Sequence, residues 1–165
     1  MMRSISTVFG LGLMRPAPGT WGSAAATFAG LVILKLFGFP VLVAATIAVT
    51  SLGFWACQSE LAGRPGEDPS EIVIDEVAGQ WLALLFPAAA FWWRGSEAWM
   101  PYPGWVAAFL FFRLFDIWKP GVIGRADQRH DAAGVMLDDL WAGVFAGIAT
   151  VIAAGVFHGA MWLWP

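Results

Sequence analysis

Long runs of apolar residues are the feature that most constrains how this chain of 165 residues can fold. Five such runs follow one another, and they cover residues 21–37, 39–57, 75–93, 104–118 and 138–164. Hydrophobic residues make up 59% of the chain and charged residues only 13%, whereas a soluble domain is about 45–50% apolar and about 25% charged. The surplus apolar surface must therefore face something other than water, and single segments cross a bilayer as helices.

These runs predict an all-α, polytopic membrane protein with about four to five transmembrane helices. A helix needs about 20 residues to cross a hydrocarbon layer of ~30 Å, so residues 5–14 are too short and are expected to form a short N-terminal helix at the interface. Eleven Trp residues, placed largely near the ends of the apolar runs, suit the aromatic belts of a membrane protein. No linker-like change in composition divides residues 1–165, which predicts a single domain.

The polar segments between the runs predict a shared site. If each run crosses once, residues 16–23, 58–76 and 113–139 all lie on one face. Eleven of the twelve acidic residues and seven of the nine basic residues share that face, with only Lys35, Arg94 and Glu97 opposite. Because an excess of Lys and Arg marks the cytoplasmic side, we expect the three segments to meet at the cytoplasmic face.

Two acidic pairs, Asp75-Glu76 and Asp138-Asp139, each lie between a short apolar triplet and a long apolar run. One such pair alone could be a helix N-cap that interacts favourably with the helix dipole. Two pairs at the same depth favour a site for a hard cation, because Mg²⁺ prefers carboxylate oxygens and keeps waters that a phosphate can displace. We therefore expect Asp75, Glu76, Asp138 and Asp139 to be metal ligands.

Arg113, Asp116 and Lys119 are spaced so that a helix would place them on one broad face. One interpretation is an Arg113–Asp116 ion pair with Lys119 extending to the interface. The other is phosphate binding by the guanidinium and ammonium groups, which neutralise phosphate oxygens beside a metal.

The segment 16–23 is a candidate anion cradle. Gly19, Thr20 and Ser23 belong to it, and its glycines permit exposed backbone amides near a helix N-terminus. A helix-breaking turn explains the same residues equally well. Asp127 and Asp131 are expected to be solvated, and neither His130 nor His158 has a partner at metal-ligand spacing.

Several classes of protein are disfavoured by the same sequence. A net charge of -3 and the absence of a basic run give no support to nucleic-acid binding. Cys57 is the single cysteine, which excludes an internal disulfide framework. A membrane transporter is the main alternative to an enzyme, but its charges are expected near the centres of the spans. A non-catalytic protein of the same fold is the other alternative.

Four segments resemble those of the phosphatidylglycerophosphatase A family, and they occur in the family's order. They are PAPGTWGS (Pro16–Ser23), IVIDEVAGQW (Ile72–Trp81), FRLFDIWKP (Phe112–Pro120) and GVMLDDLWAG (Gly134–Gly143). The resemblance implies a multi-pass protein of the bacterial cytoplasmic (inner) membrane with its active site facing the cytoplasm. It implies Mg²⁺-dependent removal of the terminal phosphate of phosphatidylglycerophosphate, which leaves phosphatidylglycerol.

The resemblance also implies roles for individual residues. The implied catalytic acidic residues are Asp75, Glu76, Asp116, Asp138 and Asp139. Arg113 and Lys119 are implied as the cations that hold the phosphate. The nucleophile is left open between a metal-bound water and a carboxylate such as Asp116.

Overall fold

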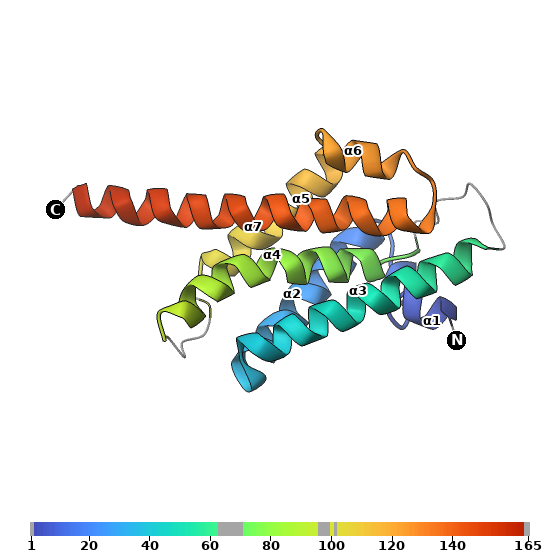
Figure 1. Ribbon diagram of the computed structural model, residues 1–165, viewed down its shortest axis with the longest axis horizontal. Coiled ribbons are helices and arrows are strands. Elements are labelled where there is room, and N and C mark those ends of the chain that lie inside the picture. Colours follow the sequence, from blue (N-terminus) through green and yellow to red (C-terminus); the bar gives the residue numbers. More distant parts are fainter. Residues whose placement is uncertain (1, 63–70, 96–99, 101, 164–165) are drawn as a thin grey trace.

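The computed structural model describes residues 2–62, 71–95, 100 and 102–163, and all regular secondary structure in these ranges is helical (Figure 1). This confirms the all-α prediction. The elements in chain order are α1 (Met2–Ser6), η1 (Leu11–Leu13), α2 (Pro18–Phe37), α3 (Phe39–Leu61), α4 (Ile74–Trp93), α5 (Gly104–Trp118), α6 (Val122–Asp127) and α7 (Ala132–Leu163).

Three of the described helices are long and apolar enough to cross a membrane. They comprise α2, α3 and residues 132–158 of α7. Helix α5 has 15 residues, which corresponds to about 22 Å at ~1.5 Å per residue. Helix α4 has 20 residues but carries Asp75 and Glu76 in its first turn and Pro87 in its interior. The expected four to five crossings therefore stay a prediction for α4 and α5.

Helix α4 lies at the centre of the bundle, with α7 on one side and α2 and α3 on the other (Figure 1). Its crossing with α7 depends on two glycines. A Cβ atom added at Gly143 would meet the carbonyl oxygen of Gly79, and one added at Gly79 would lie 2.5 Å from the carbonyl oxygen of Asp139. Small residues allow membrane helices this close approach. The Trp81 indole fixes α4 on α2 by donating to the carbonyl oxygen of Ala26 at 2.8 Å.

Helix α7 begins earlier than the sequence suggested, at Ala132. The Asp131 carboxylate accepts a hydrogen bond from the Gly134 N–H at 2.6 Å, as a helix cap does. Asp138 and Asp139 consequently lie inside the helix, and the interpretation of this pair as an N-cap is wrong.

Three local predictions also differ from the structure. Helix α2 begins at Pro18, before the apolar run at 21–37, and without a side-chain cap. The polar segment 113–139 contains the short helix α6 between α5 and α7. The N-terminal stretch divides into α1 and η1. Residues 63–70 of the polar segment 58–76, and Glu97 on the expected opposite face, lie outside the described residues.

Candidate active site

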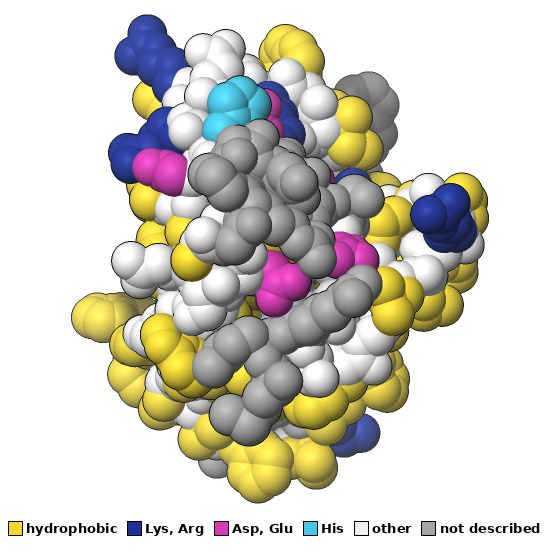
Figure 2. All heavy atoms as spheres, turned by 90° about the vertical axis from the view of Figure 1, so that its right-hand side faces the viewer, with side chains coloured by type: hydrophobic (Ala, Val, Ile, Leu, Met, Phe, Trp, Pro, Cys, Tyr) yellow, Lys and Arg dark blue, Asp and Glu magenta, His cyan; other side chains and the backbone are white. Residues whose placement is uncertain are grey.

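A cavity of about 280 Å³ lies where the N-terminal ends of α2, α4 and α7 meet the C-terminal end of α5. Figure 2 looks onto this end of the molecule, where acidic side chains and a histidine reach the surface. All three polar segments of the sequence contribute to its wall, as predicted. The predicted site residues that line it are Gly19, Thr20, Asp75, Glu76, Arg113, Asp116, Lys119, Asp138 and Asp139.

Three carboxylates from two helices form the acidic centre of the cavity. Asp75, Glu76 and Asp139 each offer an oxygen, and these oxygens lie within 4.8 Å of one another. Asp75 and Asp139 are 8% and 3% exposed. The close α4–α7 crossing at Gly79 brings Asp139 to the start of α4. Buried like charges at this separation are costly unless a cation accompanies them.

This donor set fits Mg²⁺, which takes hard oxygen ligands from one or two carboxylates together with waters and phosphate oxygens. The Glu76 Oε2 atom supports the fit, because it is buried without a hydrogen-bond partner among the described residues. Asp138 differs from the other three predicted ligands. Its Oδ2 accepts a hydrogen bond from Lys119 Nζ at 2.8 Å, and its Oδ1 accepts one from the Asp139 N–H at 2.9 Å.

Lys119 joins three elements at the cavity wall. It is the C-cap residue of α5, with a left-handed backbone (φ 49°), and its ammonium group bonds to Asp127 of α6 as well as to Asp138 of α7. Burial lowers the pKa of Lys119, but the hydrogen bonds and charges of these two carboxylates raise it further, to a net value above its usual range. Lys119 therefore stays protonated throughout the neutral range.

Arg113 lies in α5, six residues before Lys119, and also lines the cavity. Its Nη1 is 2.5 Å from Asp116 Oδ2 and donates to Ser23 Oγ at 3.3 Å. The Arg113–Asp116 ion pair foreseen from their spacing is therefore present. The buried Nε of Arg113 has no partner among the described residues.

The first turn of α2 closes another side of the cavity. A Cβ atom added at Gly19 would meet Glu76 Oε1 and lie 3.3 Å from Arg113 Nη1, so that the α2 backbone approaches both groups closely. Free N–H groups at a helix N-terminus attract anions. Ser23 alone among the predicted site residues does not line the cavity. It is fully buried, and its hydroxyl donates to the Gly19 carbonyl oxygen at 2.7 Å.

Asp127 and His130 line the cavity although sequence reasoning gave neither a role. Asp127 was expected to be solvated, but it binds Lys119. Asp127 reaches Lys119 because it lies at the end of α6, and the sequence did not predict that helix. The spacing of the two residues in the sequence therefore gives no indication of this contact.

The fold and the cavity together define an all-helical protein with membrane-type helices and a buried acidic centre flanked by cations. The family model described as phosphatidylglycerophosphatase A matches residues 4–154. The chain belongs to the phosphatidylglycerophosphatase A family, and it is an enzyme of that family.

Relatives with curated names are similar over most of their length. A Haemophilus influenzae protein named phosphatidylglycerophosphatase A is 37% identical over 85% of this chain and 80% of its own. An Escherichia coli protein of the same name is 32% identical over 95% of this chain and 81% of its own. A Bacteroides thetaiotaomicron protein named "Putative phosphatidylinositol-3-phosphatase" is 36% identical over 92% of both chains. No solved structure matches the chain.

Proposed function

We propose that this protein hydrolyses phosphatidylglycerophosphate to phosphatidylglycerol and inorganic phosphate, with Mg²⁺, at the cytoplasmic face of the bacterial inner membrane. One observation carries the proposal: three carboxylates, those of buried Asp75 and Asp139 and of half-buried Glu76, share a cavity with Arg113 and Lys119. Such a set suits a phosphate monoester, whose oxygens need both a metal and cationic side chains. The family supplies the lipid substrate.

Asp75, Glu76 and Asp139 would hold the metal, which when bound polarises a phosphoryl oxygen and makes a bound water more acidic. Arg113, together with the first-turn amides of α2, would bind the remaining phosphate oxygens. Lys119 adds a fixed positive charge, which Asp127 and Asp138 hold in place. The close pairing of Asp116 with Arg113 favours water over the Asp116 carboxylate as the nucleophile.

A lipid phosphate reaches such a site if the cavity lies at the level of the headgroups. Helix α7 has 32 residues, so its length of about 48 Å exceeds the ~30 Å hydrocarbon layer. Its first two turns, which carry Asp138 and Asp139, can then extend into the headgroup layer. We propose that α4 and α5 are also inserted in the membrane, which gives the four to five crossings expected from the sequence.

A second candidate substrate is a phosphoinositide, because the Bacteroides relative is named for one. The chemistry would be the same, since both substrates are phosphate monoesters of a lipid polyol. The cavity volume of about 280 Å³ lies at the lower limit of ligand pockets, about 300–1,000 Å³. This favours the smaller glycerol phosphate over an inositol ring.

The test is phosphate release by the purified protein in detergent, from phosphatidylglycerophosphate and in parallel from phosphatidylinositol 3-phosphate. We expect release from the first lipid with Mg²⁺, loss with EDTA, and loss in Asp75→Asn and Asp139→Asn. Glu60→Gln, on α3 and outside the cavity lining, is the matched control. Unchanged release in the two aspartate variants would remove the proposed site, and release without Mg²⁺ would remove the proposed metal.

A further inference from the structure

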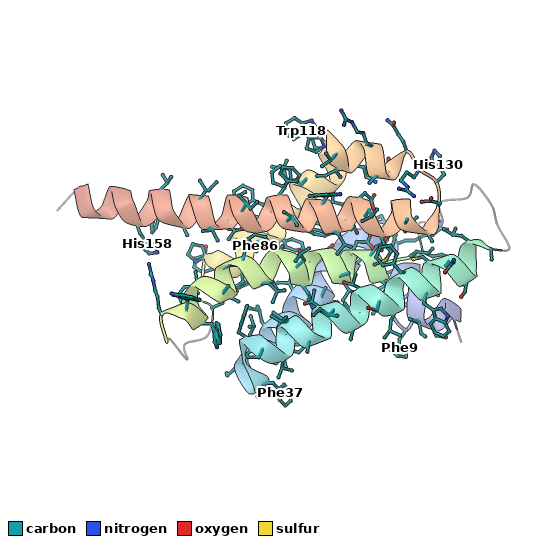
Figure 3. All side chains as sticks on the ribbon, viewed as in Figure 1. Phe9, Phe37, Phe86, Trp118, His130 and His158 are labelled. Atoms are coloured by element: carbon teal, nitrogen blue, oxygen red, sulfur yellow. The ribbon has the colours of Figure 1, made fainter. Side chains whose placement is uncertain are left out.

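His130 lines the cavity but has no place in the reaction outlined above. It lies in the turn between α6 and α7, whereas His158 lies toward the other end of α7 (Figure 3). We propose that His130 is the catalytic acid that gives a proton to the glycerol oxygen as this oxygen leaves phosphorus. The inference rests on the proposed function, because it assigns a role within that hydrolysis.

The turn that carries His130 is fixed on both sides of the imidazole. Arg129 donates through Nε and Nη2 to the two carboxylate oxygens of Asp131, at 3.2 and 3.0 Å. The Asp131 carboxylate also caps α7 at the Gly134 N–H. His130 itself has a left-handed backbone, with φ 52°, a conformation that non-glycine residues adopt uncommonly.

The ion pair between Arg129 and Asp131 persists at the pH of an enzyme assay. The hydrogen bonds from Arg129 and from the Gly134 N–H lower the pKa of Asp131 below its usual value. Asp131 is therefore ionised at neutral pH. The side chains on either side of His130 hold each other, and the His130 side chain itself is exposed at the cavity wall.

Hydrolysis of this ester needs a proton donor. A water oxygen forms a bond to phosphorus, the bond between phosphorus and the glycerol oxygen breaks, and its electron pair stays on the glycerol oxygen. An alkoxide is a poor leaving group, so protonation of this oxygen as the bond breaks lowers the barrier. The imidazolium gives that proton to the leaving oxygen, and the attacking water, in line on the other side of phosphorus, gives its own proton to solvent. The neutral imidazole then regains a proton from solvent, so that the products are the alcohol and inorganic phosphate.

The other polar groups of the cavity are less suited to this step. Lys119 is held by two carboxylates that keep it protonated, and Arg113 cannot be deprotonated in a protein. Asp75, Glu76 and Asp139 are assigned to the metal. An imidazole is the side chain that most often transfers protons near neutral pH. Arg129 and Asp131 flank His130 in its turn, and the charged groups that line the cavity with it are Asp75, Glu76, Arg113, Asp116, Lys119, Asp127, Asp138 and Asp139.

The experiment compares wild type, His130→Asn and His158→Asn on phosphatidylglycerophosphate in detergent with Mg²⁺. Asparagine tolerates the left-handed backbone and keeps a hydrogen-bond donor, but it cannot transfer a proton. We expect kcat of His130→Asn to fall about 10²-fold or more, with KM changed by no more than about threefold. His158→Asn keeps the wild-type rate.

Two readouts separate proton donation from a structural role. A lipid analogue whose phosphate is esterified to a nitrophenol has a leaving group that needs no proton, so His130→Asn should hydrolyse it within about threefold of wild type. The alkaline decline of wild-type kcat, which reports loss of the acid's proton, should disappear in His130→Asn. If wild type does not hydrolyse the analogue, the pH profile alone distinguishes proton donation from a structural role.

The outcomes are distinguishable from those of the proposed function. Wild-type kcat in His130→Asn, an equal loss on both esters, or an unchanged alkaline decline would overturn the role of His130 while leaving the phosphatase intact. Failure of wild type to release phosphate from phosphatidylglycerophosphate would instead overturn the proposed function, and the role of His130 with it.

Discussion

Asp138 and Asp139 are adjacent in sequence but have different partners. Asp139 faces Asp75 and Glu76, whereas Asp138 binds Lys119. We predict that Asp139→Asn raises the Mg²⁺ concentration needed for half-maximal rate by at least about tenfold, because a ligand oxygen is lost. Asp138→Asn should raise KM for the lipid and leave the Mg²⁺ requirement within about threefold. Mg²⁺ titrations at saturating lipid measure this difference, and equal shifts in the two variants would contradict it.

Gln80 is fully buried in α4, and neither polar atom of its amide has a partner among the described residues. A buried unsatisfied amide costs about 1–3 kcal/mol. Gln80→Leu, with similar volume, should therefore raise the thermal midpoint of unfolding in detergent. Gln58→Leu at an exposed position of α3 is the control and should change the midpoint little. A lower midpoint in Gln80→Leu would mean that the Gln80 amide forms a hydrogen bond with a group other than the described residues of the protein.

The sequence was sufficient to predict most of the residues that line the cavity, because the four segments that resemble the family contain them. It predicted the Arg113–Asp116 ion pair but not the partners of the two acidic pairs. Both acidic pairs follow an apolar triplet, so they looked equivalent, yet Lys119 distinguishes them in three dimensions. Asp127 and His130 stayed unrecognised because their places depend on α6, whose six residues are too few to show a helical period.

At the scale of elements, the α4–α7 crossing sets the geometry of the acidic centre. We predict that Gly143→Ala destabilises the protein by about 1–3 kcal/mol, because its methyl group would meet the Gly79 backbone. The displaced α7 should also carry Asp139 away from Asp75, so that the Mg²⁺ requirement rises. Thermal unfolding in detergent and a Mg²⁺ titration measure the two effects.

Gly155→Ala is the matched control on the same helix, since a Cβ atom there has nothing within 4 Å. Alanine favours a helix over glycine by about 1 kcal/mol, so this variant should be as stable as wild type or more stable. Equal stability of the Gly143 and Gly155 variants would show that the two helices do not depend on this close approach.

The boundaries of α5 followed well from the sequence. The start of α7 did not, because its cap is Asp131 rather than the acidic pair.

At the scale of the whole molecule, the distribution of charge predicts the orientation in the membrane. Six of the nine described Asp and Glu residues line the cavity at one end of the bundle, and the turn between α2 and α3 lies at the other (Figure 1). Helix α2 has 20 residues, which is about 30 Å and enough to cross the hydrocarbon layer. Since Lys and Arg favour the cytoplasmic side, we predict that the cavity end faces the cytoplasm.

Cysteine labelling tests this orientation in bacterial spheroplasts with a membrane-impermeant maleimide. Cys57 is buried, so the wild-type chain is the unlabelled background. Phe37→Cys and Arg94→Cys, at exposed positions of the far end, should react in intact spheroplasts. Arg15→Cys and Gln128→Cys, exposed at the cavity end, should react only after the membrane is permeabilised. Helices α3, α4 and α5 lie between Phe37 and Gln128, and an odd number of them must cross to place the two positions on opposite faces. Labelling of Phe37→Cys and Gln128→Cys from the same side would therefore contradict the predicted orientation.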